Sequence, residues 1–153
     1  MPDIATDYRG NWVAVWNAYP GGGISYSHDD GKTWSAPQHI LQHAKGLNAP
    51  QVETDGVGNW IAVLQESVGH GIFHLTYSHS TDNGRTWSDG AYLVKDPPYF
   101  ESAKSGIWLT QTDEGELVAS WYCYSAEGTN SAGDSDIFLS MLKEETPAPP
   151  RAY

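Results

Sequence analysis

Ten residues in the sequence combine aromatic side chains with carboxylates, amides and an imidazole. Aromatic rings can stack on the face of a sugar, while the polar groups hydrogen-bond its hydroxyls. These residues are Tyr19, Glu66, His70, Tyr99, Phe100, Glu101, Tyr124, Glu127, Asn130 and Asp134. They predict a site for a glycan or another small polar ligand. The alternative is that they are solvated loop residues, with one or two aromatic rings covering the ends of strands.

Three histidines lie close together in the sequence, at His70, His74 and His79. His70 and His74 would share one face of a strand, as two ligands of a metal ion could. A metal site also needs a third ligand and partners that orient the ligands, and the sequence indicates neither. We therefore predict strand-surface histidines and no metal site.

The segment 130–136 is rich in oxygen donors. Asn130, Asp134 and Asp136 could offer oxygen ligands to Ca²⁺, but the segment lacks the order of an EF-hand loop and its closing Glu. The favoured interpretation is a Gly/Ser-rich loop, with calcium as the alternative. We expect no other cofactor.

Composition excludes several classes of partner. The 153 residues hold 8 Lys and Arg against 19 Asp and Glu, a net charge of -11, so no basic stripe exists for nucleic acid or for anionic lipid. No apolar run approaches the roughly 18 residues of a membrane-spanning helix, and the first residues do not resemble a signal peptide. Cys123 is alone, which excludes an internal disulfide. We expect a soluble single domain of unknown compartment.

The elements that position the candidate residues are short strands. The sequence contains 7 Trp, 9 Tyr and 16 Gly, a bias toward aromatic strands and glycine turns. Segment 2–16 returns without a gap as segment 50–64 and, more weakly, as segment 107–121. Each copy is typical of a strand, an Asp/Gly turn and a second strand.

A second motif follows the first two copies. Segments 27–34 and 80–87 share the pattern Ser-x-Asp-x-Gly-x-Thr-Trp. The Asp can accept hydrogen bonds from backbone N–H groups, the Gly can adopt a positive φ, and the Trp can fold back onto the turn. The third copy has a matching approach strand but no such octet, so its unit is incomplete.

Each unit holds about four strands in roughly 50 residues, which is typical of a propeller blade. We predict an all-β fold of about three four-stranded antiparallel blades, the third incomplete, in units 2–49, 50–105 and 106–143, followed by a Pro-rich tail at 144–153. The predicted strands are Asp3–Thr6, Asn11–Trp16, Gly23–Ser27 and Gln38–Leu41; Gln51–Thr54, Asn59–Leu64, Ile72–Ser78 and Ala91–Val94; and Ile107–Gln111, Leu117–Tyr122 and Asp136–Met141. Segment 11–16 alternates Trp-Ala-Trp on one face with Val-Val on the other, as a blade between two neighbours requires.

The octets resemble the Asp-box, or bacterial neuraminidase repeat, of sialidase-like β-propellers. The resemblance extends over nearly the whole chain. In that family the boxes lie on the side away from the active site, and the proteins are usually secreted or on the cell surface. The resemblance therefore implies a structural role for the box residues, which are Ser27, Asp29, Gly31, Thr33, Trp34, Ser80, Asp82, Gly84, Thr86 and Trp87.

A sialidase of this family would hold the sugar carboxylate with three arginines. The arginines of this sequence are Arg9 and Arg85 in turns and Arg151 in the tail, so the expected cluster is missing. A Tyr nucleophile with a Glu partner could be sought in two places. The catalytic candidates are Tyr99 with Glu101, and Tyr122 or Tyr124 with Glu127.

Positions that differ between the units are expected to carry function, because repeated positions build the blade. They fall in loops opposite the Asp-boxes, where the ten candidate residues lie. These loops are 17–22, 65–71 and 123–135 between the second and third strands, and 42–49 and 95–105 between units.

These observations favour a non-catalytic sialidase-like module with a glycan-recognition or structural role. One alternative is part of an exo-α-sialidase type glycoside hydrolase. Another is an assembly module, because Trp12, Trp16 and Trp121 are expected on bare end faces. Two chains could then close a six-bladed ring, the blade number of the sialidases that the sequence resembles. We expect a homodimer.

Overall fold

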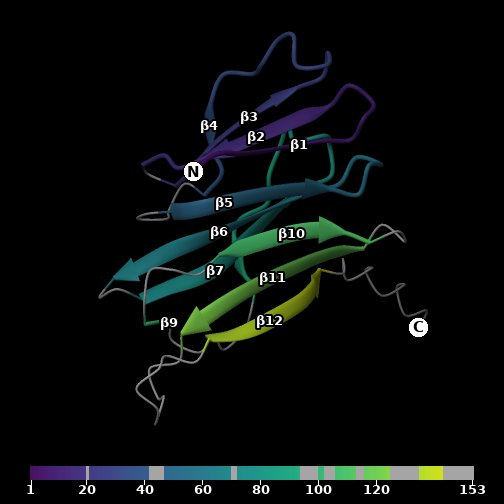
Figure 1. The fold of residues 1–153 in the computed structure, drawn as a ribbon. Helices are drawn as coiled ribbons and strands as arrows, with labels where there is room; N and C mark the ends of the chain where they lie inside the picture. The colour runs from purple at the N-terminus through teal and green to yellow at the C-terminus, as the bar shows by residue number, and fades with distance from the viewer. Residues whose placement is uncertain are drawn as a thin grey trace, which may run out of the picture.

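The computed structural model describes residues 1–19, 21–41, 47–69, 72–93, 100–101, 106–112, 116–124 and 135–142. The elements in these residues are all β-strands, arranged in three antiparallel sheets (Figure 1). Blade 1 consists of β1 (Asp3–Thr6), β2 (Trp12–Trp16), β3 (Gly23–Ser27) and β4 (Gln38–His39). Blade 2 consists of β5 (Leu47–Thr54), β6 (Trp60–Gly69), β7 (Ile72–Ser80) and β8 (Ala91–Tyr92), with β9 (Phe100–Glu101) also paired to β7. Blade 3 consists of β10 (Ile107–Gln111), β11 (Leu117–Tyr124) and β12 (Ser135–Leu142).

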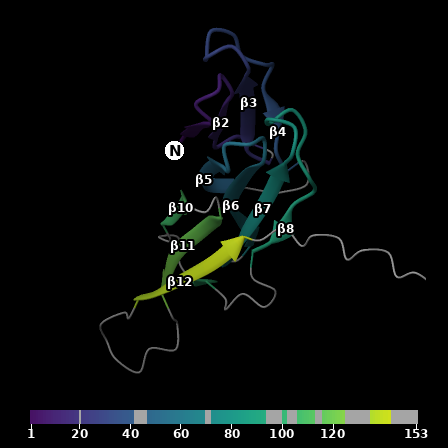
Figure 2. The ribbon, with the colours of Figure 1, turned by 90° about the vertical axis from the view of Figure 1, so that its right-hand side faces the viewer.

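The three sheets stack on one another, with their first strands side by side. Within each sheet the strands follow one another in chain order, as Figure 2 shows from left to right. The first strands β1 and β5 contact each other, and β10 contacts β5 on its other side. The Val52 backbone N–H donates to Asp3 Oδ2 at 2.9 Å, which joins the first strands of blades 1 and 2. This arrangement confirms the prediction of an all-β fold made of propeller blades.

Two apolar clusters fill the spaces between neighbouring blades. In the first, Val13 and Val15 of blade 1 pack with Trp60, Ala62 and Leu64 of blade 2. The second cluster joins the opposite face of blade 2 to blade 3 and contains Ile61, Val63, Leu75, Ile107, Leu117, Ala119 and Trp121. Because side chains alternate across a strand, both faces of β6 are apolar and both are buried. The predicted alternation in β2 is also confirmed, with both valines fully buried.

The turn between the first two strands of blade 1 closes around an aspartate. Asp7 Oδ1 accepts hydrogen bonds from the backbone N–H groups of Arg9 and Asn11 at 2.7 and 3.0 Å, and Asp7 Oδ2 accepts one from Asn11 Nδ2 at 2.5 Å. Blade 2 repeats these bonds with Asp55 as the acceptor and Val57 and Asn59 as the donors. The Asp/Gly turns of the repeat are therefore carboxylate-centred turns.

The Asp-box of blade 1 closes the turn after β3 in the same manner. Asp29 accepts from the backbone N–H and the hydroxyl of Thr33 at 2.8 and 2.6 Å, and from the Ser27 hydroxyl at 2.8 Å. Ser27 Oγ in turn accepts from the Gly31 N–H at 3.0 Å, and Trp34 Nε1 donates to the Gly31 carbonyl at 3.0 Å.

The second Asp-box, after β7, has the same bonds. Asp82 accepts from Ser80 and Thr86, Ser80 accepts from the Gly84 N–H, and Trp87 Nε1 donates to the Gly84 carbonyl. The local sequence therefore fixes the same turn geometry in both blades.

The two turns of a blade lie at the same end, and hydrogen bonds join them. The Asp30 N–H donates to the Gly10 carbonyl at 3.1 Å in blade 1, and the Asn83 N–H donates to the Gly58 carbonyl at 3.3 Å in blade 2. In blade 1, His28 Nδ1 also lies 2.6 Å from Asn11 Oδ1. Each blade thus has one end closed by a pair of linked turns.

Several strands differ in length from the sequence prediction. The second and third strands of blade 2 continue to Gly69 and Ser80, because each extended strand finds its partner in the other. The outer strands β4 and β8 are only two residues long. β9 lies in a segment predicted as a loop and pairs Phe100 with Phe73 of β7.

Blade 3 has three strands among the residues that the structure describes, and the segment after Leu142, where a fourth strand would follow, lies outside them. The predicted tail 144–153 lies outside these residues. In the same described part of the chain, no helix is long and apolar enough to cross a membrane.

Candidate functional site

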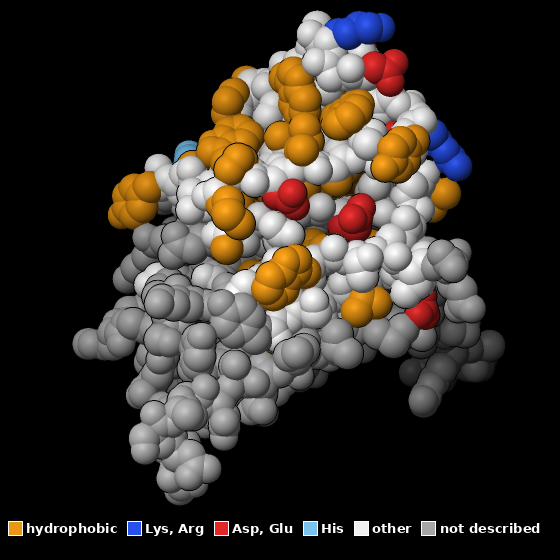
Figure 3. Space-filling model, in the orientation of Figure 1, with side chains coloured by type: hydrophobic (Ala, Val, Ile, Leu, Met, Phe, Trp, Pro, Cys, Tyr) orange, Lys and Arg blue, Asp and Glu red, His pale blue; other side chains and the backbone are white. Residues whose placement is uncertain are grey.

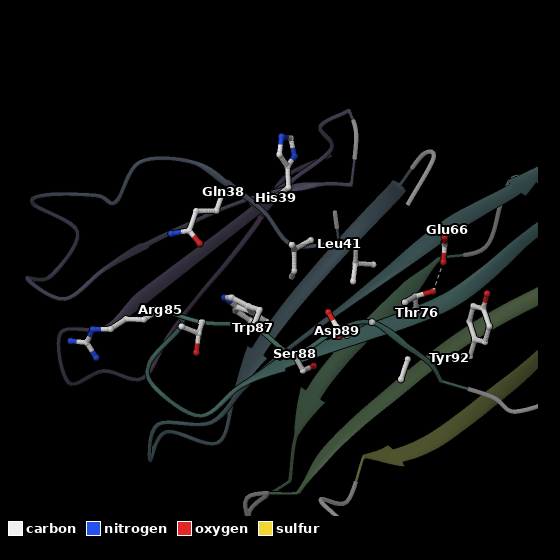
Figure 4. A pocket seen from close by; sticks show the side chains of 14 residues that line it. Gln38, His39, Leu41, Glu66, Thr76, Arg85, Trp87, Ser88, Asp89 and Tyr92 are labelled. Atoms are coloured by element: carbon white, nitrogen blue, oxygen red, sulfur yellow. Dashed lines mark hydrogen bonds between the residues drawn. The ribbon is translucent and has the colours of Figure 1, made fainter. Parts of the chain in front are cut away.

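A groove runs along the outer boundary between blades 1 and 2. Its volume is about 650 Å³. One wall comes from Gln38 and His39 of β4, and the other comes from the segment that leaves the second Asp-box and enters β8. Figure 4 shows Arg85 at one end of the groove and Glu66 with Tyr92 at the other, with Trp87 and Leu41 between them. The groove therefore combines aromatic, amide and charged groups.

The end of the groove near Tyr92 offers both a ring and a carboxylate. Tyr92 is 50% exposed, and the His74 ring meets it edge-on at a centroid distance of 4.8 Å. Glu66 Oε2 accepts a hydrogen bond from the buried Thr76 hydroxyl at 3.1 Å. Glu66 Oε1 accepts none from any residue that the structure describes. A fixed carboxylate with one open oxygen beside an exposed aromatic ring can bind a sugar hydroxyl while the ring stacks on the sugar.

Close packing at Gly90 fixes the floor of the groove. A Cβ on Gly90 would lie 2.5 Å from Leu41 Cδ2 and 2.9 Å from Thr76 Cγ2. The segment that enters β8 therefore lies directly against Leu41 of blade 1 and Thr76 of blade 2, and a larger residue at position 90 would displace these side chains.

Charges at the other end of the groove belong to the second Asp-box. Arg85 Nη1 donates to the Asp82 carbonyl at 3.1 Å, so the guanidinium is held at the turn. Burial alone would raise the pKa of Asp82, but hydrogen bonds from Thr86 and Ser80 outweigh it and lower this pKa below the usual value. The box carboxylate therefore stays ionised near neutral pH.

The matching groups of blade 1 are ionised in the same manner. Hydrogen bonds from the Thr33 side chain and backbone, and then from Ser27, lower the pKa of Asp29 to about 2. Burial acts against the ionised form of Asp7, but its hydrogen bonds from Asn11 and Arg9 still lower its pKa. These bonds already occupy the carboxylates, so the turn aspartates are structural acceptors.

His28 stays neutral near the linked turns of blade 1. Burial is the largest cause that lowers the pKa of His28, and the positive charge of Arg85 lowers it further. The nearby aspartates act in the opposite direction and raise this pKa, but by less. Asn11 Nδ2 donates to Asp7, so Asn11 Oδ1 accepts from His28 Nδ1. His28 Nε2 is buried and has no partner among the described residues.

Only part of the predicted ligand set lies in described residues. Glu66 lines the groove, whereas Tyr19 is 81% exposed on the turn after β2 and does not line it. Five further candidates lie outside the described residues, namely His70, Tyr99, Glu127, Asn130 and Asp134. The pairing of His70 with His74 and the Tyr99 and Glu101 pair therefore stay predictions, and calcium near Asp136 stays the alternative to a Gly/Ser-rich loop.

Three candidates predicted in loops belong to strands. Glu66 lies within β6, Glu101 within β9 and Tyr124 within β11. Phe100, also predicted in a loop, lies in β9, whereas Tyr122 lies in a strand as predicted. The loop prediction was wrong at Glu66, Phe100, Glu101 and Tyr124, because a partner strand supplies backbone hydrogen bonds beyond the aromatic strand cores. Trp121, expected on a bare face, is only 4% exposed and packs against blade 2.

Sequence reasoning missed the groove residues on the outer strands. The register places His39 opposite Gly23 in blade 1 and Tyr92 opposite Thr76 in blade 2, so the two residues occupy matching positions. Gln38 and Ala91 match in the same way. The units differ at both positions, and this difference is the signal that could have identified them.

No three His, Cys, Asp or Glu side chains gather as a metal site would require within the described ranges. His74 contacts Tyr92 and has a buried Nδ1 with no partner in the same ranges, while His79 is exposed. Of these two histidines, His74 thus packs against an aromatic ring and His79 faces solvent.

Comparison with known proteins identifies the fold. No protein-family model matches the sequence, and no curated protein matches it. Among solved structures, the chain matches the NanB sialidase from Streptococcus pneumoniae in complex with 2-[(3-chlorobenzyl)ammonio]ethanesulfonate, with a TM-score of 0.53 and 18% sequence identity. The match covers 89% of this chain and 20% of the sialidase chain, so this chain spans about a fifth of that protein. In its fold, the chain is a sialidase-like β-propeller module.

Proposed function

We propose that this chain is a non-catalytic propeller module that binds a neutral glycan in the groove between blades 1 and 2. The observation that carries the proposal is the end of the groove where half-exposed Tyr92 lies near Glu66, whose Oε1 is open among the described residues. A sugar ring stacked on Tyr92 would present hydroxyl groups to this carboxylate.

Charge favours a neutral glycan over an acidic one. The chain carries a net charge of -11, and this charge repels anionic ligands. Arg85 is the guanidinium that lines the groove, and it is held by the Asp82 carbonyl at the end away from Tyr92. Arg9 belongs to the first turn of blade 1. Two arginines in turns of different blades do not provide the convergent clamp that a sugar carboxylate requires.

Glycan-array binding followed by titration calorimetry tests the proposal. Wild-type protein is expected to bind neutral oligosaccharides, and Tyr92→Ala is expected to weaken binding about fivefold, because a lost stacking contact is worth about 1 kcal/mol. Glu66→Gln, which keeps an oxygen for the Thr76 hydroxyl, should also weaken binding. Tyr19→Ala is the matched control, because Tyr19 is exposed but does not line the groove. Equal binding by wild type and Tyr92→Ala would contradict the site.

Hydrolysis of α-sialosides is the alternative function, favoured by the structural match to a sialidase. Incubation with a fluorogenic sialoside separates the two functions. We expect no turnover by the purified chain. Turnover that disappears in Tyr99→Phe, Tyr122→Phe or Tyr124→Phe would instead establish the chain as part of a hydrolase.

A further inference from the structure

The outward side of blade 1 is an apolar face that the described part of the chain leaves uncovered. We call this side, away from blade 2, the leading face of blade 1. It carries Ile4, Trp12, Ala14, Trp16 and Trp34, of which Ile4 is 52% and Trp34 41% exposed. Figure 3 shows hydrophobic side chains gathered over the upper part of the molecule, where blade 1 lies. An apolar face of this kind usually marks an interface.

The same positions are buried in blade 2. Strand register matches Ile4 with Val52, Trp12 with Trp60, Ala14 with Ala62, and Trp16 with Leu64. In blade 2 these residues are at most 3% exposed, because they pack against Val13 and Val15 of blade 1. The leading face of blade 1 thus carries the kinds of residue that form the existing interface between blades.

The two Asp-box glycines show the same difference. A Cβ on Gly84 would lie 2.6 Å from Val13 Cγ2, because the second box packs against blade 1. A Cβ on Gly31 would meet only Trp34, at 3.9 Å. The first box therefore has an open position where the second box holds a valine of the preceding blade.

Blade 3 carries a matching valine on its far side. Val118 occupies the register position of Val13, and Ser120 occupies that of Val15. Both are partly exposed, and they alternate with Leu117 and Ala119, which pack toward blade 2. The backbone register pairs Val118 with Met141 and Ser120 with Leu139. We call this side the trailing face of blade 3.

We propose that the leading face of blade 1 binds the trailing face of blade 3 of a second copy of this chain. The contact would repeat the existing interface between blades 1 and 2, with Val118 of one copy against Gly31 of the other. Two copies of three blades each provide six blades, within the range of about 4–8 in which propellers close. A two-fold pair would then cover both end faces at once.

Engineered disulfides test this contact. The Cβ built on Gly84 lies 3.9 Å from Val13 Cβ, within the spacing of about 3.5–4.5 Å that a disulfide requires. In a Cys123→Ala background, the pair Gly84→Cys and Val13→Cys should therefore form a bond within one chain. The pair Gly31→Cys and Val118→Cys should form bonds between chains. Both pairs place a cysteine at a positive φ, so the first controls for backbone strain in the second.

Mass analysis under oxidising conditions gives the outcome. The pair Gly31→Cys and Val118→Cys should give covalent dimers, and either of these cysteines alone should give far fewer. The pair Gly84→Cys and Val13→Cys should give chains with no covalent link to another chain. Wild-type protein should have the mass of two chains by light scattering in 0.15 M salt, which screens the repulsion between two acidic copies. Ile4→Lys should give single chains, whereas Val57→Lys, an exposed position in the first turn of blade 2, should not.

Three results would overturn the proposal. Wild-type protein with the mass of one chain at micromolar concentration would show that another part of the chain covers the leading face or that nothing does. If the protein has the mass of two chains but the Gly31→Cys and Val118→Cys pair forms no bond between chains, the two copies contact each other through other surfaces. A ladder of trimers and larger species would show an open chain of copies instead of a closed pair.

Discussion

Replacing Gly84 by alanine tests whether the second Asp-box is held against blade 1. Gly84 has a φ of +81°, and its Cβ would lie 2.6 Å from Val13 Cγ2. Carbon atoms in ordinary contact lie about 3.5–4.0 Å apart, so the two groups must separate by about 1 Å. Val13 is β-branched and fully buried, and it cannot turn into solvent. We expect the alanine to push the two blades apart locally.

Gly31→Ala is the matched control for this variant. Gly31 has a φ of +75°, and its Cβ would meet only Trp34, at 3.9 Å. The left-handed backbone costs a residue with a Cβ about 1–2 kcal/mol, and this cost is common to both variants. The remaining difference is the overpacking against Val13, about 1–3 kcal/mol. In a domain of this size it corresponds to a difference in Tm of about 2–12 °C.

Thermal and urea unfolding, followed by circular dichroism, measure the difference. The protein concentration is kept where light scattering gives the mass of one chain, so that no second copy covers Gly31. Gly84→Ala should unfold first, and Val13→Ala should partly rescue it, because the smaller side chain leaves room for the new methyl group. Equal losses from the two glycine variants, together with no coupling between positions 84 and 13, would refute the reasoning.

Three further predictions concern the turns and the core. Asp82→Ala should lower the free energy of unfolding in urea by about 1 kcal/mol, because it leaves the Thr86 and Ser80 donors without their acceptor, while any glycan affinity stays unchanged. Asp29 has a folded pKa of about 2 against an ordinary 3.8, so the stability it contributes is present above pH 3.8 and is lost as the pH falls through 2. The difference in urea midpoint between wild type and Asp29→Asn should therefore shrink over that range. A constant difference would contradict the assignment. Trp60→Phe should cost less than the roughly 3–5 kcal/mol of a buried Trp→Ala change in the same denaturation assay, because the buried Trp60 Nε1 has no partner among the described residues.

Turn chemistry made much of the fold predictable. Strands β1, β3 and β10 begin and end where the sequence predicts, because a glycine or a carboxylate-centred turn limits each of them locally. The equivalence of the first two units also followed from the sequence, since Asp29 and Asp82 occur in the same octet. Local hydrogen bonds of this kind are specified within a few residues.

Features that depend on distant partners could not be predicted. β9 exists because Phe100 pairs with Phe73, 27 positions earlier in the chain, and nothing in the local sequence specifies that partner. The groove depends on how closely Gly90 approaches Leu41 of blade 1, and this distance follows from the packing between blades. Among the predicted ligand residues in the described ranges, Glu66 is the one that lines the groove.

Each of the first two blades satisfies the polar groups of its turns with its own residues. Asp7 and Asp29 serve blade 1, and Asp55 and Asp82 serve blade 2. A neighbouring blade therefore needs to supply mainly an apolar surface of suitable shape. A gene segment that encodes such a blade can be duplicated in tandem with its closed end intact, and each copy can then diverge on its faces independently.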